Sequence, residues 1–186
     1  MSRYLLLAAA GLALLAGCAP IHGMHYDIML DTSLTPSQVE DAMTAGASWE
    51  AAIPGLTLDY TVSACHDYQG KAHTICVFWD SGDPAVEASP PNPLALATTM
   101  TRHDGLLDPN GVDNDSATIH LWSLTMDRNN YNTDVSIANI ISHELGHAMT
   151  HRSSHIASGN LMQPTDAPNV MMPQTPFDVS YFWSTR

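Results

Sequence analysis

Alternating apolar and polar residues predict several short strands along the chain. The pattern is clearest in LTLDYTVSA and TICVFW, which have the alternation or the short apolar run of a buried strand. The predicted strands are residues 24–31, 56–64, 74–79 and 117–122, and residues 94–101 form either a further strand or a loop leading into one. One helical pattern lies between the first two strands and another follows the last strand, so the sequence predicts one mixed α/β domain.

Two longer segments have the spacing of helices. The first begins with Thr35 as N-cap and Pro36 in the first turn, and it ends at Pro54 and Gly55. Its predicted buried stripe is Val39, Met43, Ala47 and Ile53. The second helix covers Thr133–Thr150 and begins with a threonine cap followed by an aspartate. Its predicted core positions are Val135, Ile137, Ile140, Ile141, Leu145 and Met149.

Two segments are predicted loops. Residues 81–93 contain four prolines and show no periodicity. Residues 104–116 contain Asp104, Asp108, Asp113 and Asp115, a set that could bind a structural calcium ion. Their spacing does not match the ligand pattern of an EF-hand, so a solvated, turn-rich loop is the preferred interpretation.

The charge of the chain excludes several classes of partner. Its 186 residues include 6 Lys and Arg against 19 Asp and Glu, which gives a formal net charge of −13. Nucleic-acid binding requires a basic surface, and so does attachment to a membrane through a polybasic patch. The length fits one domain with a hydrophobic core, which we expect to be a monomer.

The N-terminal segment is predicted to lie outside the fold. Residues 1–17 combine Arg3 with an apolar stretch too short for a comfortable membrane span, as in a signal peptide. The sequence Leu15–Cys18 resembles the bacterial lipobox, which implies cleavage before Cys18 and a lipid on its sulfur. Ala19 in place of aspartate implies the outer membrane, facing the periplasm or the surface. The alternative is an ordinary secretory signal that leaves a free cysteine.

Export also bears on the two other cysteines. Cys65 and Cys76 would lie in an oxidising compartment, where a disulfide between them is the default. The alternative is a pair of buried thiols. Residues 18–23 then form a short tether, and residues 24–186 form the folded domain.

The second predicted helix contains the sequence HELGH, residues 143–147. Residues four apart lie on nearly the same face of a helix, so His143 and His147 can converge on one metal ion. Glu144 is rotated by about 100° from His143 and can lie beside a bound water as a general base. This pattern predicts a catalytic zinc site.

A zinc protease needs a third protein ligand. No glutamate follows the motif, so a glutamate ligand from a later helix is excluded. A straight helix would place His151 about 12 Å from His143, which favours His155 if the helix ends near residues 150–152. His151 remains the alternative, and Asp166 and Asp178 are minor options.

At this point the chain resembles the metzincin zinc proteases, most closely the matrixin-like small bacterial branch. The matching run is HELGHAMTHRSSHIASGNLMQP, residues 143–164. The resemblance implies that His143 and His147 bind zinc, that Glu144 is the base, and that Met162 forms the Met-turn beneath the metal. Met171 is the alternative Met-turn residue. Thr150 and Ser153 depart from the family pattern, in which a glycine and the third histidine occupy these positions.

The resemblance also implies the architecture. We expect an α+β domain with a twisted, mostly parallel sheet, an active-site helix, the Met-turn and a C-terminal helix capped near Thr175. It further implies that the strand at residues 117–122 is a sheet edge that pairs with extended substrate.

The predicted function is zinc-dependent hydrolysis of peptide bonds in peptide or protein substrates, with one zinc ion per chain. The alternative is a non-catalytic zinc-binding surface lipoprotein, or a degenerate protease-like binding module. Six further histidines, at positions 22, 25, 66, 73, 103 and 120, make zinc handling conceivable, although they form no tract. Glu144 distinguishes the two, because an enzyme requires it and a binding protein does not.

Overall fold

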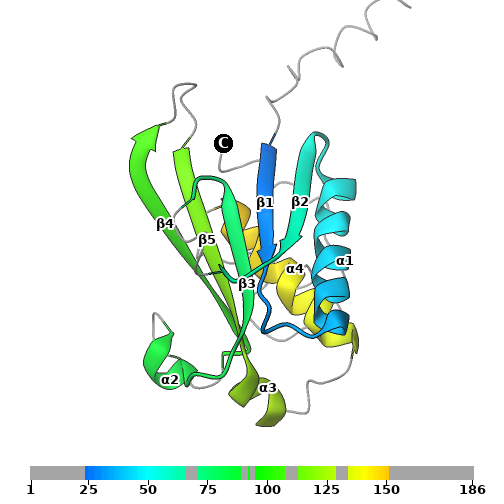
Figure 1. The fold of residues 1–186 in the computed structure, drawn as a ribbon, viewed down its shortest axis with the longest axis vertical. Coiled ribbons are helices and arrows are strands. Elements are labelled where there is room, and N and C mark those ends of the chain that lie inside the picture. The colour runs from blue at the N-terminus through cyan, green and yellow to red at the C-terminus, as the bar shows by residue number, and fades with distance from the viewer. Residues whose placement is uncertain are drawn as a thin grey trace, which may run out of the picture.

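The computed structural model describes residues 24–65, 71–88, 92, 95–107, 113–128 and 134–150 (Figure 1). The predicted signal peptide, the tether and all residues after Thr150 lie outside these ranges, so the domain boundaries stay predictions. The described elements are β1 (Met24–Leu30), α1 (Pro36–Ala52), β2 (Leu56–Val62), β3 (Thr74–Asp80), α2 (Pro84–Glu87), β4 (Ala97–Leu107), β5 (Asp113–Trp122), α3 (Ser123–Arg128) and α4 (Asp134–Thr150).

The strands form one five-stranded sheet in the order β2-β1-β3-β5-β4. Neighbouring strands are parallel except for β4, which runs antiparallel to β5. The predicted mixed α/β class and the mostly parallel sheet are therefore confirmed.

The hydrophobic core lies between this sheet and the two long helices, α1 and α4, which also pack against each other. Alternate residues of β1, Tyr26, Ile28 and Leu30, face these helices, as do Ile119 and Leu121 of β5. None of the described helices is long and apolar enough to cross a bilayer.

Helix α1 begins as predicted but turns a different face inward. Thr35 and Gln38 form a reciprocal capping box, with Pro36 in the first turn. The predicted stripe is wrong at two of its four positions, because Met43 is 46% exposed and Ala47 is also exposed. The buried face consists of Gln38, Ala42, Ala45, Gly46 and Trp49, followed by Ile53 at the C-cap. Trp49 fills the space toward α4, and burying this large ring sets the orientation of the helix.

Three loop or boundary predictions were wrong. The described parts of the segment 104–116, residues 104–107 and 113–116, belong to β4 and β5 rather than to a loop, and the register pairs Leu107 with Asp113. Asp108 lies outside the described residues, so calcium binding there stays a prediction. The short helix α2 interrupts the predicted loop 81–93, since Asp83 caps it and Pro84 occupies a first-turn position that needs no backbone N–H. Helix α3 lies between β5 and α4, where the sequence analysis predicted no element.

A disulfide joins Cys65 and Cys76, the pair that the sequence predicted. Both cysteines are buried, and they pack with Met29 on the face of the sheet opposite α1 and α4. The bridge connects the segment after β2 to β3, two parts of the chain that are not neighbours in the sheet.

Candidate functional site

Helix α4, which contains the HELGH sequence, is anchored to the rest of the fold at two points. The indole Nε1 of Trp49 donates a hydrogen bond to the carbonyl of Ser142 at 2.8 Å. The hydroxyl of Tyr26 donates to the carbonyl of Met149 at 3.2 Å. Ile141 and Leu145 are fully buried in the core between these points. The residues of the motif are therefore held on a fixed helix.

The two histidines of the motif converge. Their Nε2 atoms lie 3.0 Å apart, and the ring centroids are 4.7 Å apart with the planes nearly perpendicular. His147 is buried and His143 is half-buried. Two nitrogens that bind one tetrahedral zinc at about 2.0–2.1 Å lie about 3.3 Å from each other. The pair therefore fits a zinc ion with an adjustment of a few tenths of an ångström.

Glu144 is buried next to this pair and hydrogen-bonded to the edge strand. The hydroxyl of Thr99, on β4, lies 2.5 Å from Glu144 Oε2 and 3.2 Å from the Glu144 carbonyl oxygen. Burial raises the pKa of the Glu144 carboxyl group, and the charge of His143 and the Thr99 hydrogen bond oppose part of this shift. A carboxylate beside a converging histidine pair is the arrangement that the helical spacing predicted.

The remaining predicted site residues lie outside the described part of the chain. These are the third ligand His155 with its alternative His151, the Met-turn residue Met162 with its alternative Met171, and the lipidated Cys18. The helix reaches at least Thr150, whose hydroxyl donates to the carbonyl of Gly146 at 2.6 Å. The choice between the two histidines therefore stays a prediction.

The predicted substrate-binding edge was assigned to the wrong strand. Residues 117–122 belong to β5, which lies between β3 and β4. The edge of the described sheet is β4, because the chain returns antiparallel on the outer side of β5. The sequence showed residues 94–101 as an uncertain strand and offered no sign of this hairpin.

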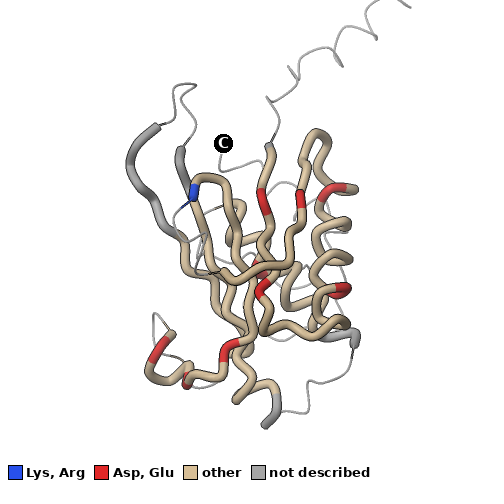
Figure 2. Tube along the Cα trace, viewed as in Figure 1, with Lys and Arg blue, Asp and Glu red and all other residues tan. Residues whose placement is uncertain are grey.

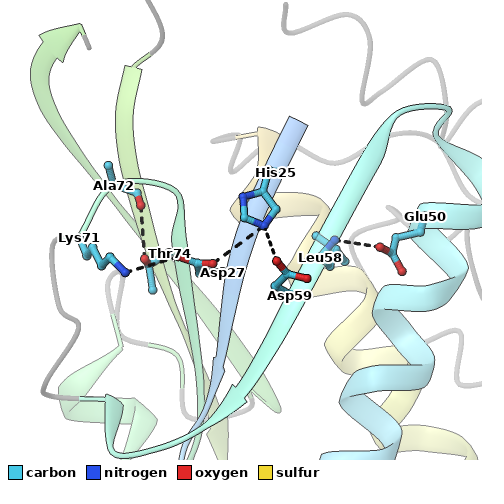
Figure 3. Close-up of polar contacts among 8 residues, drawn as sticks. All are labelled: His25, Asp27, Glu50, Leu58, Asp59, Lys71, Ala72 and Thr74. Carbon is cyan, nitrogen blue, oxygen red and sulfur yellow. Dashed lines mark hydrogen bonds and ion pairs between the residues drawn. The ribbon is translucent and has the colours of Figure 1, made fainter. Parts of the chain in front are cut away.

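A second polar cluster lies on the opposite face of the sheet (Figure 3). Asp27 and Asp59 are directly opposite each other on the parallel strands β1 and β2. His25 Nε2 lies 2.9 Å from Asp59 and 4.0 Å from Asp27, and Lys71 Nζ lies 3.5 Å from Asp27. Among the described residues, His25, Asp27 and Asp59 also bring three potential metal-ligand atoms within 4.8 Å of one another.

This cluster has an adequate explanation without a metal. Like charges directly opposite on neighbouring strands are destabilising. The His25 ring gives Asp59 a hydrogen-bond partner, and Lys71 supplies a compensating cation for Asp27. The side chains of His25 and Asp59 are 49% and 79% exposed, so water also screens the charges. Figure 2 shows that acidic residues are spread over several elements, so this group is one part of a generally acidic surface.

Sequence analysis missed the cluster, although its signal was present. His25 and Asp27 are two residues apart on a strand and must share a face. Asp59 joins them only through the register of β1 with β2, which a single sequence does not show.

A third polar pair, also missed, lies between β3 and β5. His120 Nδ1 is 2.7 Å from Asp80 Oδ2, and the imidazole ring stacks on Trp122 and contacts Phe78 edge-on. The pair is mostly buried, at 13% and 16% exposure. It ties the ends of two neighbouring strands together on the face opposite α4.

The chain matches no protein-family model and no curated protein. The functional interpretation therefore depends on the residues and their geometry.

Proposed function

We propose that this protein is a zinc-dependent endopeptidase. The observation that carries the proposal is the convergence of His143 and His147, whose Nε2 atoms lie 3.0 Å apart beside the buried carboxylate of Glu144. Two imidazoles and an adjacent base are the components that a hydrolytic zinc site requires from one helix. The metzincin-like architecture beyond the mixed α/β fold is part of this proposal.

Metal binding and proton transfer are assigned to different residues of the chain. His143 and His147 hold the metal, and His155, or alternatively His151, completes the ligand set, with Met162 or Met171 beneath it. A bound zinc ion supplies Lewis acidity, which polarises the peptide carbonyl and makes water nucleophilic near neutral pH. Glu144 accepts the proton of the attacking water and then donates it to the leaving amine.

The free edge of β4 offers a place for an extended substrate. Trp122 N–H donates to the carbonyl of Leu96, which fixes the alternation of backbone hydrogen bonds between β4 and β5. Ala97, Thr99 and Thr101 consequently direct their N–H and C=O groups away from β5. Within the described residues no strand pairs with this edge, so a peptide can add to the sheet next to Glu144.

The decisive experiment uses the mature chain without its lipid and the variant Glu144→Gln. We expect the wild-type chain to bind one zinc ion and to cleave an unstructured peptide, and the variant to retain zinc and lose about 10²- to 10⁴-fold in kcat. Equal cleavage by the two proteins would refute the role of Glu144. Zinc binding without cleavage in either protein would favour a non-catalytic zinc-binding module.

The cellular location is a separate proposal. Cys18 carries the lipid that holds the protein at the outer membrane, and incorporation of labelled fatty acid tests this directly. The label should appear in the wild-type protein and be absent from Cys18→Ser.

A further inference from the structure

The contact between Thr99 and Glu144 joins two elements that are distant in sequence. Thr99 lies on the edge strand β4, and Glu144 lies 45 residues later on α4. Thr99 Oγ1 is 2.5 Å from Glu144 Oε2, within the range of strong hydrogen bonds between a hydroxyl and a carboxylate. Among the described residues, Thr99 is the side chain that donates to this carboxylate.

The position of the Thr99 hydroxyl is restricted by its strand. Thr99 is opposite Ile119 in the antiparallel register of β4 with β5, and the preceding side chain, Thr98, points to the other face of the sheet. There the Thr98 hydroxyl accepts a hydrogen bond from Trp122 Nε1 at 3.0 Å. Because a threonine side chain has two heavy atoms on Cβ, its χ1 angle is stiff. The hydroxyl of Thr99 therefore reaches the helix from a fixed place.

The Glu144 side chain by itself is much less restricted. Three rotatable torsions separate its carboxylate from the helix backbone. The helical spacing fixes only the direction of the Cα–Cβ bond, not the position of the carboxylate. A general base must lie within hydrogen-bond reach of the proton that it accepts, and a misplacement of about 1 Å can cost about 100-fold in rate. A hydrogen bond to Oε2 from one side leaves Oε1 available to face the reacting water.

We propose that Thr99 is a positioning residue, whose hydroxyl holds the Glu144 carboxylate in the orientation needed beside the His143 and His147 pair. The contact itself follows from the structure, and its effect on rate rests on the proposed peptidase function. The backbone N–H and C=O of Thr99 point to the side of β4 on which no strand of the described sheet pairs. The residue that orients the base therefore belongs to the strand beside which the substrate would lie.

The first test compares three variants of the full chain. Thr99→Val removes the hydroxyl at nearly constant volume, Thr99→Ser retains it, and Thr98→Val removes a hydroxyl from the opposite face of the same strand. We expect Thr99→Val to lower kcat about 10- to 100-fold with KM within twofold and the zinc content unchanged. Thr99→Ser should recover most of the rate, and Thr98→Val should keep the wild-type kcat even if it unfolds at a lower temperature.

The second test does not depend on activity. The chain contains four glutamates, so labelling them with ¹³C at the carboxyl carbon gives a simple spectrum, in which Glu144→Gln identifies the Glu144 resonance. In the metal-free full chain, Thr99→Val should shift and broaden this resonance, whereas Thr99→Ser and Thr98→Val should leave it near its wild-type position.

The outcomes separate this proposal from the proposed function. An unchanged Glu144 resonance in Thr99→Val would overturn the positioning role, and so would a wild-type kcat in that variant or a Thr99→Ser variant as slow as Thr99→Val. If the wild-type chain cleaves no peptide, the peptidase proposal fails, and the resonance alone decides whether Thr99 holds the carboxylate.

Discussion

The two faces of the sheet each bring histidine close to a carboxylate, with different consequences. On the face covered by α1 and α4, His147 and Glu144 are each 8% exposed, and the two imidazoles of the motif face each other. On the opposite face, His25 is 49% exposed and is paired with Asp59 across two strands. Both clusters contain residues that bind metals, yet we assign zinc only to the first.

The two clusters differ in the partners that their potential metal-ligand atoms already have. On the opposite face, the ring nitrogen of His25 already has the Asp59 carboxylate as its hydrogen-bond partner, and the ammonium group of Lys71 compensates Asp27. On α4, two nitrogens that are both good metal ligands lie 3.0 Å apart on a rigid helix. A cation between them would replace the hydrogen bond between the two rings with two coordinate bonds. Burial and convergence, rather than the mere presence of ligands, distinguish a metal site from a solvated ion-pair cluster.

The largest effect is expected from removing His147, and the control is the removal of His25 on the opposite face of the sheet. His147→Ala should abolish stoichiometric zinc binding and peptide cleavage, because the metal loses one of its helical ligands. His25→Ala should retain one zinc ion per chain and the wild-type rate. Metal analysis after dialysis, together with a peptide cleavage assay, checks both variants. Loss of the zinc in His25→Ala would show that the exposed cluster is the principal metal site.

The next largest effect concerns the support of α4. Trp49→Phe removes the hydrogen bond to Ser142 and leaves a cavity at a fully buried position. We expect the free energy of unfolding to fall by about 2–4 kcal/mol and zinc to bind more weakly, since His143 directly follows the lost contact. Urea unfolding and zinc titration measure the two effects.

The matched control for Trp49→Phe is Met43→Leu, which also lies on α1. Met43 is 46% exposed, so Met43→Leu should change the free energy of unfolding by no more than about 0.5 kcal/mol. Equal stability of the Trp49→Phe variant and the wild type would contradict the view that α1 holds α4 in place.

Local rules explain what the sequence predicted correctly. The Thr35 cap, the helix over Asp134–Thr150 and the placing of His143 and His147 on one face depend on residues within a few positions of each other. The Cys65–Cys76 disulfide was predicted from an expected oxidising compartment and from the number of cysteines. Each of these features is settled by spacing or chemistry that can be evaluated without the rest of the fold.

The failures at α1 and β4 involve partners distant in sequence. The buried face of α1 depends on Trp49 packing toward α4, and the edge position of β4 depends on an antiparallel return that the sequence did not indicate. Thr99 illustrates the same limit within the site. No pattern around residue 99 connects it to Glu144, because only the packing of α4 against β4 brings them together.

A smaller effect on stability is expected at Tyr60 of β2, whose neighbour Asp59 faces the opposite side of the sheet. Tyr60 faces α1, where burial raises its pKa to about 12, with a further contribution from the charge of Glu50. The ionised form is thus disfavoured in the fold, and the resulting stability is present below pH 10 and is lost as the pH rises from about 10 to about 12. Tyr60→Phe should lack this part of the alkaline decline.

Thermal unfolding of both proteins between pH 8 and pH 12 is the measurement, because the difference between the two curves cancels the titration of the other tyrosines. Parallel curves over this range would show that Tyr60 ionises as readily in the folded chain as in the unfolded one. The pH range is the one expected from the pKa of about 12.

The smallest effect is expected at Asp59, on the solvent side of the same strand. Asp59→Asn removes the pairing with His25 but also relieves the repulsion between Asp59 and Asp27, which are directly opposite in register. The two terms oppose each other at a side chain that is 79% exposed, so the free energy of unfolding should change by less than about 1 kcal/mol. The difference should shrink further between about 0.05 M and 0.5 M salt, because exposed charges are screened. Urea unfolding at the two salt concentrations measures this difference. A loss of free energy of unfolding above about 2 kcal/mol that persists at high salt would mean that the exposed cluster stabilises the fold as strongly as a buried cluster does.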